Sequence, residues 1–139
     1  MQRGDFDLTA EVDSIRKSNP KIGAVASFIG QVRDVGMTLE HYPGMTENSI
    51  RKIVEEARSR WQVMDCTVIH RYGELKPTDQ IVLVAVASAH RGDAFAACEF
   101  IMDYLKTRAP FWKKEHGPQG ARWVEAHSSD DEAAERWRP

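Results

Sequence analysis

Residues 80–108, QIVLVAVASAHRGDAFAACEFIMDYLKTR, decide the fold because they run from a buried strand directly into a long helix. Residues 80–88 are apolar from Ile81 onward, which predicts a central strand with both faces covered. Asp93 is a good N-cap for the helix, and Pro110 predicts that the helix ends near Thr107. The positions expected to face the core recur at helical spacing, at Ala94, Cys98, Ile101 and Leu105.

The flanking sequence predicts further helices and strands in an order that mixes hairpins with strand–helix units. Helices are expected after residue 8, after a Thr46 cap, and after a capping box at residues 129–132. Strands are expected at 23–29, 37–42, 66–71, 111–115 and 121–127, with turn character at 73–77. This order predicts an α+β fold, with residues 1–139 forming one domain.

Composition excludes several classes of protein. Nineteen basic and twenty-one acidic side chains give a net charge of −2, so nothing global indicates a nucleic-acid or membrane partner. Cys66 and Cys98 form no CxxC pair, and Cys98 is expected to be a reduced core thiol. The first residues lack the apolar segment of a secretory signal peptide, so a cytoplasmic protein is expected.

The first candidate site is an anion site at the junction between the buried strand and the helix. His90 and Arg91 lie where unpaired backbone N–H groups and the helix dipole favour a phosphate. Arg33, shortly after the first strand and close to Gly30, is a second candidate for binding an oxyanion. The alternative is that all three side chains are simply solvated on loops.

The second candidate site is a run of cations, Lys106, Arg108, Lys113 and Lys114, interrupted by the apolar residues 109–112. Lysines beside bulky apolar groups can be partly desolvated, which lowers their pKa and makes a usable base or nucleophile. The alternative is a dipole-complementing lysine at a helix end followed by an alternating strand. The five histidines show no metal-ligand spacing, and no metal site is predicted.

Several of these segments resemble the large, catalytic subunit of molybdopterin synthase. The segments that carry the resemblance are 28–33 (FIGQVR), 39–46 (LEHYPGMT), 68–71 (VIHR), 88–91 (SAHR), 100–115 (FIMDYLKTRAPFWKKE) and 122–126 (RWVEA). The likeness extends from about residue 23 to residue 137. The block through Lys106 and Lys113 is its most specific part.

The resemblance implies a fold, partners and a reaction. The fold is of the α/β hammerhead type, and the chain forms a homodimer at the core of a heterotetramer. The other partner is a small ubiquitin-like subunit whose C-terminal Gly-Gly carries sulfur as a thiocarboxylate. The substrate is cyclic pyranopterin monophosphate, two sulfur transfers build its dithiolene, and no cofactor is needed.

The resemblance also implies which residues act. It places the catalytic residues at Lys106 and Lys113. It places substrate-binding residues at Gln31, Val32, Arg33, His90, Arg91, Lys106, Lys113, Lys114 and Glu115.

Two departures from the family pattern bear on the pocket. The link at residues 34–36 is short, and His127 stands where some relatives have an arginine. Two other functions compete with catalysis: a non-catalytic adaptor that docks a ubiquitin-like tail, and a single-stranded nucleic-acid binder that uses Phe111 and Trp112. The paired lysines argue against the adaptor, and the slightly acidic net charge argues against the nucleic-acid binder.

Overall fold

The computed structural model describes residues 1–118, 120–124 and 128–139, which contain four helices and seven strands. The helices are α1 (Leu8–Arg16), α2 (Met45–Arg60), α3 (Arg91–Arg108) and α4 (Ser128–Glu135). The strands are β1 (Ala24–Gln31), β2 (Gly36–His41), β3 (Asp65–His70), β4 (Gly73–Leu75), β5 (Gln80–Ser88), β6 (Phe111–Gly117) and β7 (Gly120–Val124). The predicted α+β class is confirmed, and all strand pairings within the two sheets are antiparallel.

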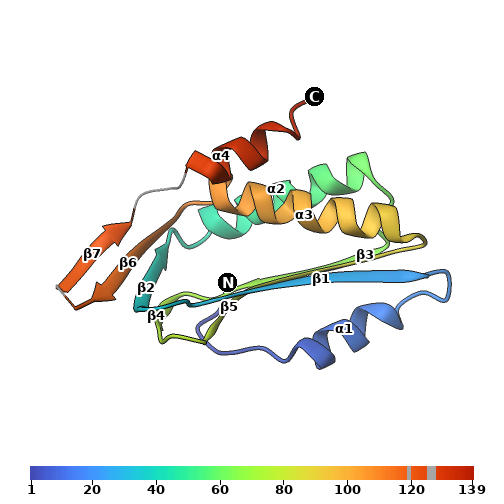
Figure 1. Cartoon of the computed structure of the whole chain (residues 1–139). Coiled ribbons are helices and arrows are strands. Elements are labelled where there is room, and N and C mark those ends of the chain that lie inside the picture. Colours follow the sequence, from blue (N-terminus) through green and yellow to red (C-terminus); the bar gives the residue numbers. More distant parts are fainter. Residues whose placement is uncertain (119, 125–127) are drawn as a thin grey trace.

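The long sheet has the strand order β1-β5-β3, and helices cover both of its faces (Figure 1). Alternate side chains of a strand point to opposite faces, so both sets on β5 must be apolar. Leu83, Ala85 and Ala87 cluster with Ile15 of α1 on one face. Val82, Val84 and Val86 join the main core beneath α2 and α3 on the other. The predicted central strand is therefore confirmed.

Helix α3 is buried over more than one stripe because several elements surround it. It packs on β1 and β5, and also contacts α2 and α4. Its predicted core residues Ala94, Cys98, Ile101 and Leu105 are all buried. So are Phe100 and Tyr104, which a single sheet-facing stripe would leave out. The helix therefore holds the residues of its last turn in a fixed place relative to β1.

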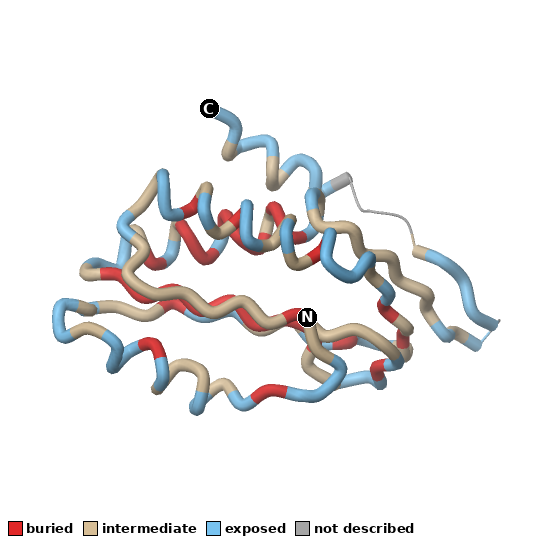
Figure 2. Tube along the Cα trace, turned by 180° about the vertical axis from the view of Figure 1, so that it is seen from behind, coloured by how far each residue is buried: buried red, intermediate tan, exposed pale blue. Residues whose placement is uncertain are grey.

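The short sheet has the order β4-β2-β6-β7 and projects from one end of the molecule (Figure 1). β6 follows α3 closely, and Phe111 pairs with His41 at the start of its ladder with β2. β7 is largely exposed, as Figure 2 shows, whereas most residues of β6 are of intermediate burial. Because side chains alternate, Phe111, Lys113 and Glu115 share one face of β6. Trp112 and Lys114 lie on the other.

Some local predictions are wrong at helix starts. Thr46 does not cap α2: the helix begins at Met45 after Gly44, and the buried Thr46 hydroxyl donates to the carbonyl of Tyr42 over 2.8 Å. Asp93 does not cap α3, which begins at Arg91. Its carboxylate instead accepts from the backbone N–H of Gln62 over 3.0 Å.

Other differences concern strands and the terminal helix. The predicted turn at residues 73–77 contains β4, which pairs with β2 through Leu75 and Met37. The terminal helix begins at Ser128, one residue before the predicted capping box. The predicted last strand ends at Val124, and its remaining residues 125–127, His127 included, lie outside the described part of the chain.

Both cysteines are free, which confirms the prediction for Cys98. The Cys98 thiol donates to the carbonyl of Val84 over 3.6 Å, and burial raises its pKa to about 11. Burial also raises the pKa of Cys66 to about 12. Both groups are therefore protonated thiols at neutral pH. Within the described part of the chain, none of the helices has the length and apolar character needed to span a bilayer.

Candidate active site

Lys106 lies in the last turn of α3, at the side of a pocket of about 430 Å³. The pocket opens between β1 and α3, and Asp130 of α4 contributes to its rim. The residues that line it are Ala26, Ser27, Phe28, Phe95, Cys98, Glu99, Met102, Asp103, Lys106 and Asp130. Its walls are therefore apolar around one lysine and three carboxylates.

Lys113 is half-buried on β6, opposite Leu39 of β2 and Val124 of β7. Burial lowers the pKa of Lys113, and the positive charge of Lys106 lowers it further. Asp130 and Glu115 act in the opposite direction. The predicted partial desolvation is therefore confirmed for Lys113, which lies within electrostatic reach of Lys106, but not for Lys106, whose side chain is exposed.

His70, at the end of β3, is a buried group beside the two lysines, and no spacing pattern in the sequence marks it as a site residue. Its ring stacks on Phe111 with centroids 4.0 Å apart. Nδ1 lies 2.9 Å from the carbonyl oxygen of Arg71, so Nδ1 carries the proton and donates. Burial lowers the pKa of His70 to about 4, and the charges of Lys113 and Lys106 contribute to this shift. The ring is therefore neutral at neutral pH.

A buried neutral histidine predicts a specific dependence of stability on pH. Between about pH 6.5 and about pH 4 the unfolded chain binds a proton at His70 that the folded chain does not, so the free energy of unfolding falls as the pH is lowered. The loss attributable to His70 is up to about 3 kcal/mol. Chemical denaturation across this range measures it.

His70→Phe is the matched variant, because it keeps a ring against Phe111 and removes the titrating group. We expect a shallower loss of stability on acidification than in the wild type, whatever the stability at neutral pH. An unchanged slope between pH 6.5 and pH 4 in this variant would show that His70 is not the group responsible.

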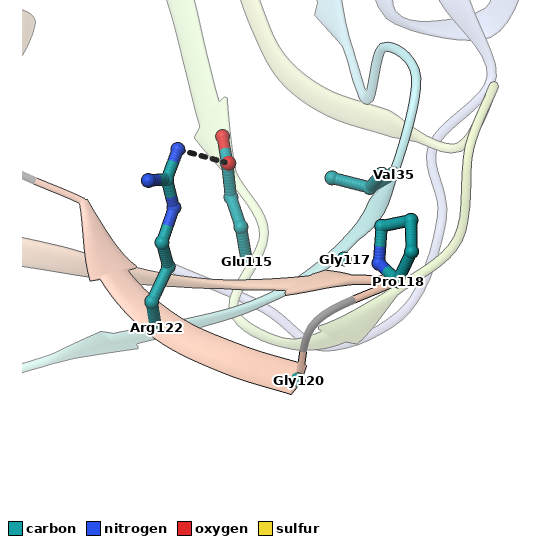
Figure 3. Close-up of a pocket in the computed structure, with 6 residues that line it drawn as sticks. All are labelled: Val35, Glu115, Gly117, Pro118, Gly120 and Arg122. Carbon is teal, nitrogen blue, oxygen red and sulfur yellow. Dashed lines mark ion pairs between the residues drawn. The ribbon is translucent and has the colours of Figure 1, made fainter.

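Lys114 and Glu115 point to opposite faces of β6. The ammonium of Lys114 lies 5.5 Å from the centroid of the Trp123 ring. Glu115 lines a second pocket of about 370 Å³ at the β6–β7 hairpin, where Arg122 lies 3.9 Å from its carboxylate (Figure 3). Of these two residues, Glu115 therefore shares the face of Lys113.

Gln31, Val32 and Arg33 leave β1 towards the short sheet, and they differ in exposure. The Val32 side chain is buried in the main core. Its backbone N–H donates to Asp79 over 2.9 Å, and its carbonyl accepts from Thr78 over 2.8 Å. Gln31 and Arg33 are exposed; the Arg33 side chain is 91% accessible, and its Nε lies 3.9 Å from the carboxylate of Asp34. The buried Val32 therefore anchors this segment, while the side chains of Gln31 and Arg33 extend into solvent.

His90 and Arg91 lie at the N-terminus of α3, as predicted, and both are exposed. About 22 Å of helix separates Arg91 from Lys106, at the usual rise of about 1.5 Å per residue. A single chain therefore places His90 and Arg91 far from Lys106, although Phe95, one turn after Arg91, lines the same pocket. The structure does not bring all the predicted site residues together within one copy.

The apolar walls of the Lys106 pocket are the part that sequence reasoning missed. Phe28 of β1 and Phe95 of α3 are 44% and 65% exposed, unusual for phenylalanine, and both line the pocket. Met102, one turn before Lys106 on α3, lines it too. The segments that carry the family resemblance include Phe28 and Met102, but no pattern marked them as pocket residues.

Comparison with known proteins identifies the family. The family model described as "MoaE protein" matches residues 1–108. The molybdopterin synthase catalytic subunit of Ralstonia nicotianae is 61% identical over 144 residues, covering 99% of this chain and 82% of the relative. The chain belongs to the MoaE family. It therefore stands among molybdopterin synthase catalytic subunits, enzymes of molybdenum cofactor biosynthesis.

Solved structures of MoaE relatives have the same fold. The molybdopterin biosynthesis MoaE protein from Burkholderia ambifaria is 62% identical, with a TM-score of 0.86 over 98% of this chain and 94% of that one. Molybdopterin synthase from Staphylococcus aureus is 32% identical, with a TM-score of 0.81 over 88% of this chain and 93% of that one. The resemblance seen in the sequence is thus confirmed at the level of family and fold.

Proposed function

We propose that this MoaE family chain transfers sulfur from the C-terminal thiocarboxylate of a small ubiquitin-like subunit to cyclic pyranopterin monophosphate. The observation that carries the proposal is the pocket of Lys106, with the desolvated Lys113 close by. Burial lowers the pKa of Lys113, and the charge of Lys106 lowers it further. A lysine with a lowered pKa gives up its proton more readily than a solvated lysine, which favours proton transfer in acyl and phosphoryl chemistry. The relatives' name, "catalytic subunit", implies that those enzymes have a further subunit.

In the proposed reaction, the thiocarboxylate sulfur attacks a carbon of the pterin side chain and replaces the oxygen bound to it. In one transfer the displaced oxygen stays on the phosphate, whose ring opens, and in the other it leaves as water. Water then cleaves the bond between the partner's carbonyl carbon and the sulfur, which leaves a thiol on the pterin and a carboxylate on the partner. A second partner molecule repeats the transfer and completes the dithiolene. Lys106 acts as acid and base or forms a transient bond to the tail. Lys113 stabilises negative charge or moves protons as the cyclic phosphate opens.

The anion site at the start of α3 joins this pocket if two copies of the chain pair along β1. β1 is an edge strand of the long sheet, with exposed Phe28 and Phe95 beside it. Its Ala24 end pairs with Ser88, just before His90. A two-fold axis across the middle of β1 would bring the Ala24 end of one copy against the Gln31 end of the other. Each lysine pocket would then receive His90 and Arg91 from the second copy.

The remaining assigned residues are proposed to complete the substrate site. Gln31 and Arg33 offer exposed polar groups beyond the end of β1, and Lys114 and Glu115 extend the site along β6. The adaptor alternative is less well supported, because docking a tail requires neither a desolvated lysine nor a second cation beside it.

Reconstitution tests this proposal. The purified chain is mixed with a thiocarboxylated small partner and cyclic pyranopterin monophosphate, and the dithiolene product is measured. We expect product to form only when all three components are present. Binding of the partner without any product would favour the adaptor function instead.

A further inference from the structure

The C-terminal arm, residues 128–138, is fastened to α3 by two carboxylates. Figure 1 shows α4 lying along the outer side of α3. The Oδ2 atom of Asp103 accepts from Arg136 over 2.9 Å and from the indole N–H of Trp137 over 2.7 Å. Glu99, one turn earlier, forms a second ion pair with Arg136.

At the end of the arm, the Trp137 side chain packs against aromatic residues of the main core. The Trp137 ring meets Trp61 at 5.3 Å and Phe100 at 5.7 Å between centroids, edge to face in both cases. Arg60 of α2 donates to the backbone carbonyl of Trp137. The arm is therefore anchored to two helices by polar and apolar contacts.

The anchor and the lysine pocket share residues. Glu99 and Asp103 line the pocket from α3, and Asp103 lies one turn before Lys106. Asp130, at the other end of the arm, lines the same pocket. Asp103 therefore both holds the arm and lines the pocket. Asp130, which belongs to the arm, also lines the pocket.

We propose that Asp103 is a positioning residue. It anchors the C-terminal arm so that Asp130 closes one side of the Lys106 pocket and faces Lys106 and Lys113. The inference rests on the sulfur-transfer function proposed above. We assign Asp103 a role through the arm because Arg136 and Trp137 both donate to its Oδ2 atom.

The charge of Asp130 gives the arm a measurable effect on Lys113. The charged or titratable groups that act on this lysine come from several elements: Lys106 from α3, Asp130 from α4, Glu115 from its own strand and His70 from β3. Asp130 raises the pKa of Lys113, against burial and Lys106. If the arm is released, that carboxylate departs and the pKa of Lys113 falls. Because Lys113 works as a cation, the alkaline limb of the pH–rate profile then moves to lower pH.

The test compares Asp103→Ala, Trp137→Phe and Arg138→Gln in the reconstituted enzyme. Trp137→Phe keeps an aromatic ring but removes the N–H donor to Asp103. Arg138→Gln is the matched control, because Arg138 pairs only with Glu135 inside the arm, over 3.1 Å, among the described residues. Limited trypsin digestion, followed by mass spectrometry, reports cleavage after Arg136 as a measure of arm release.

For Asp103→Ala we expect trypsin to cut the arm about ten-fold faster or more, since charge-assisted hydrogen bonds are lost. The KM for the pterin precursor should rise and the alkaline limb should shift to lower pH. Trp137→Phe should change the same quantities less, and Arg138→Gln should match the wild type. Faster cleavage with unchanged KM and pH profile would overturn the positioning role.

Asp130→Asn removes the charge of Asp130 and keeps the contacts of Asp103 with Arg136 and Trp137. The proposal can therefore be tested even if Asp103→Ala fails to fold. We expect the alkaline limb to shift to lower pH while the arm resists trypsin as in the wild type. An unshifted limb would overturn the role assigned to Asp130. If the wild-type mixture makes no product, the sulfur-transfer function itself fails, and with it any role of Asp103 in that reaction.

Discussion

Replacing Lys106 with alanine is expected to abolish dithiolene formation while leaving the fold and the binding of the small partner intact. Lys106 is exposed at the end of α3, so its removal leaves no cavity in the core. The partner's tail would be held along much more of its length than one side chain. Loss of a group that transfers protons or bonds to the tail typically costs on the order of 10²–10⁴-fold in rate.

Lys106→Arg tests whether Lys106 takes part in the chemistry itself or acts only through its positive charge. A guanidinium keeps the positive charge but holds its proton at neutral pH, so we expect this variant to be nearly as defective as Lys106→Ala. Lys52→Ala, on the exposed surface of α2, is the matched control and should retain full activity. Near-normal turnover by Lys106→Arg would reduce Lys106 to an electrostatic anchor. Near-normal turnover by Lys106→Ala would remove it from the mechanism.

Arg91→Ala is expected to raise the KM for the pterin precursor with little change in the fold. Arg91 is exposed at the first position of α3, where its guanidinium adds to the N–H groups of a helix N-terminus. A charge-assisted phosphate contact contributes on the order of 1.5–3 kcal/mol, which is roughly a 10- to 150-fold change in KM. Precursor binding equal to the wild type would exclude Arg91 from the site.

Much of the fold follows from local sequence patterns. The apolar run of β5 predicted its central place because a strand covered on both faces needs both sets of side chains to be apolar. Caps were predicted less well, because Thr46 and Asp93 are good capping residues that make other contacts here. β4 was missed because three residues with a glycine of positive φ look like a turn until β2 pairs with them.

The sequence predicts which charged residues belong to the candidate site, but it does not predict how they are arranged. Lys106 and Lys113 carry both a local signal and the family resemblance, and the structure brings them into electrostatic reach of each other. His70 was not singled out, because only its place against Phe111 shows that it borders the lysines. The separation of Arg91 from Lys106 follows from their places at opposite ends of one predicted helix, but the sequence does not state which residues a second copy supplies.

Subunit complementation tests most directly whether two chains build one catalytic site. Lys106→Ala and Arg91→Ala chains are co-expressed with different tags, and the mixed dimer population is assayed with the thiocarboxylated partner at limiting precursor. If the site is shared, each hybrid dimer contains one site with both native residues, and random pairing gives about a quarter of wild-type activity. Activity no higher than the average of the two variants alone would contradict the shared site.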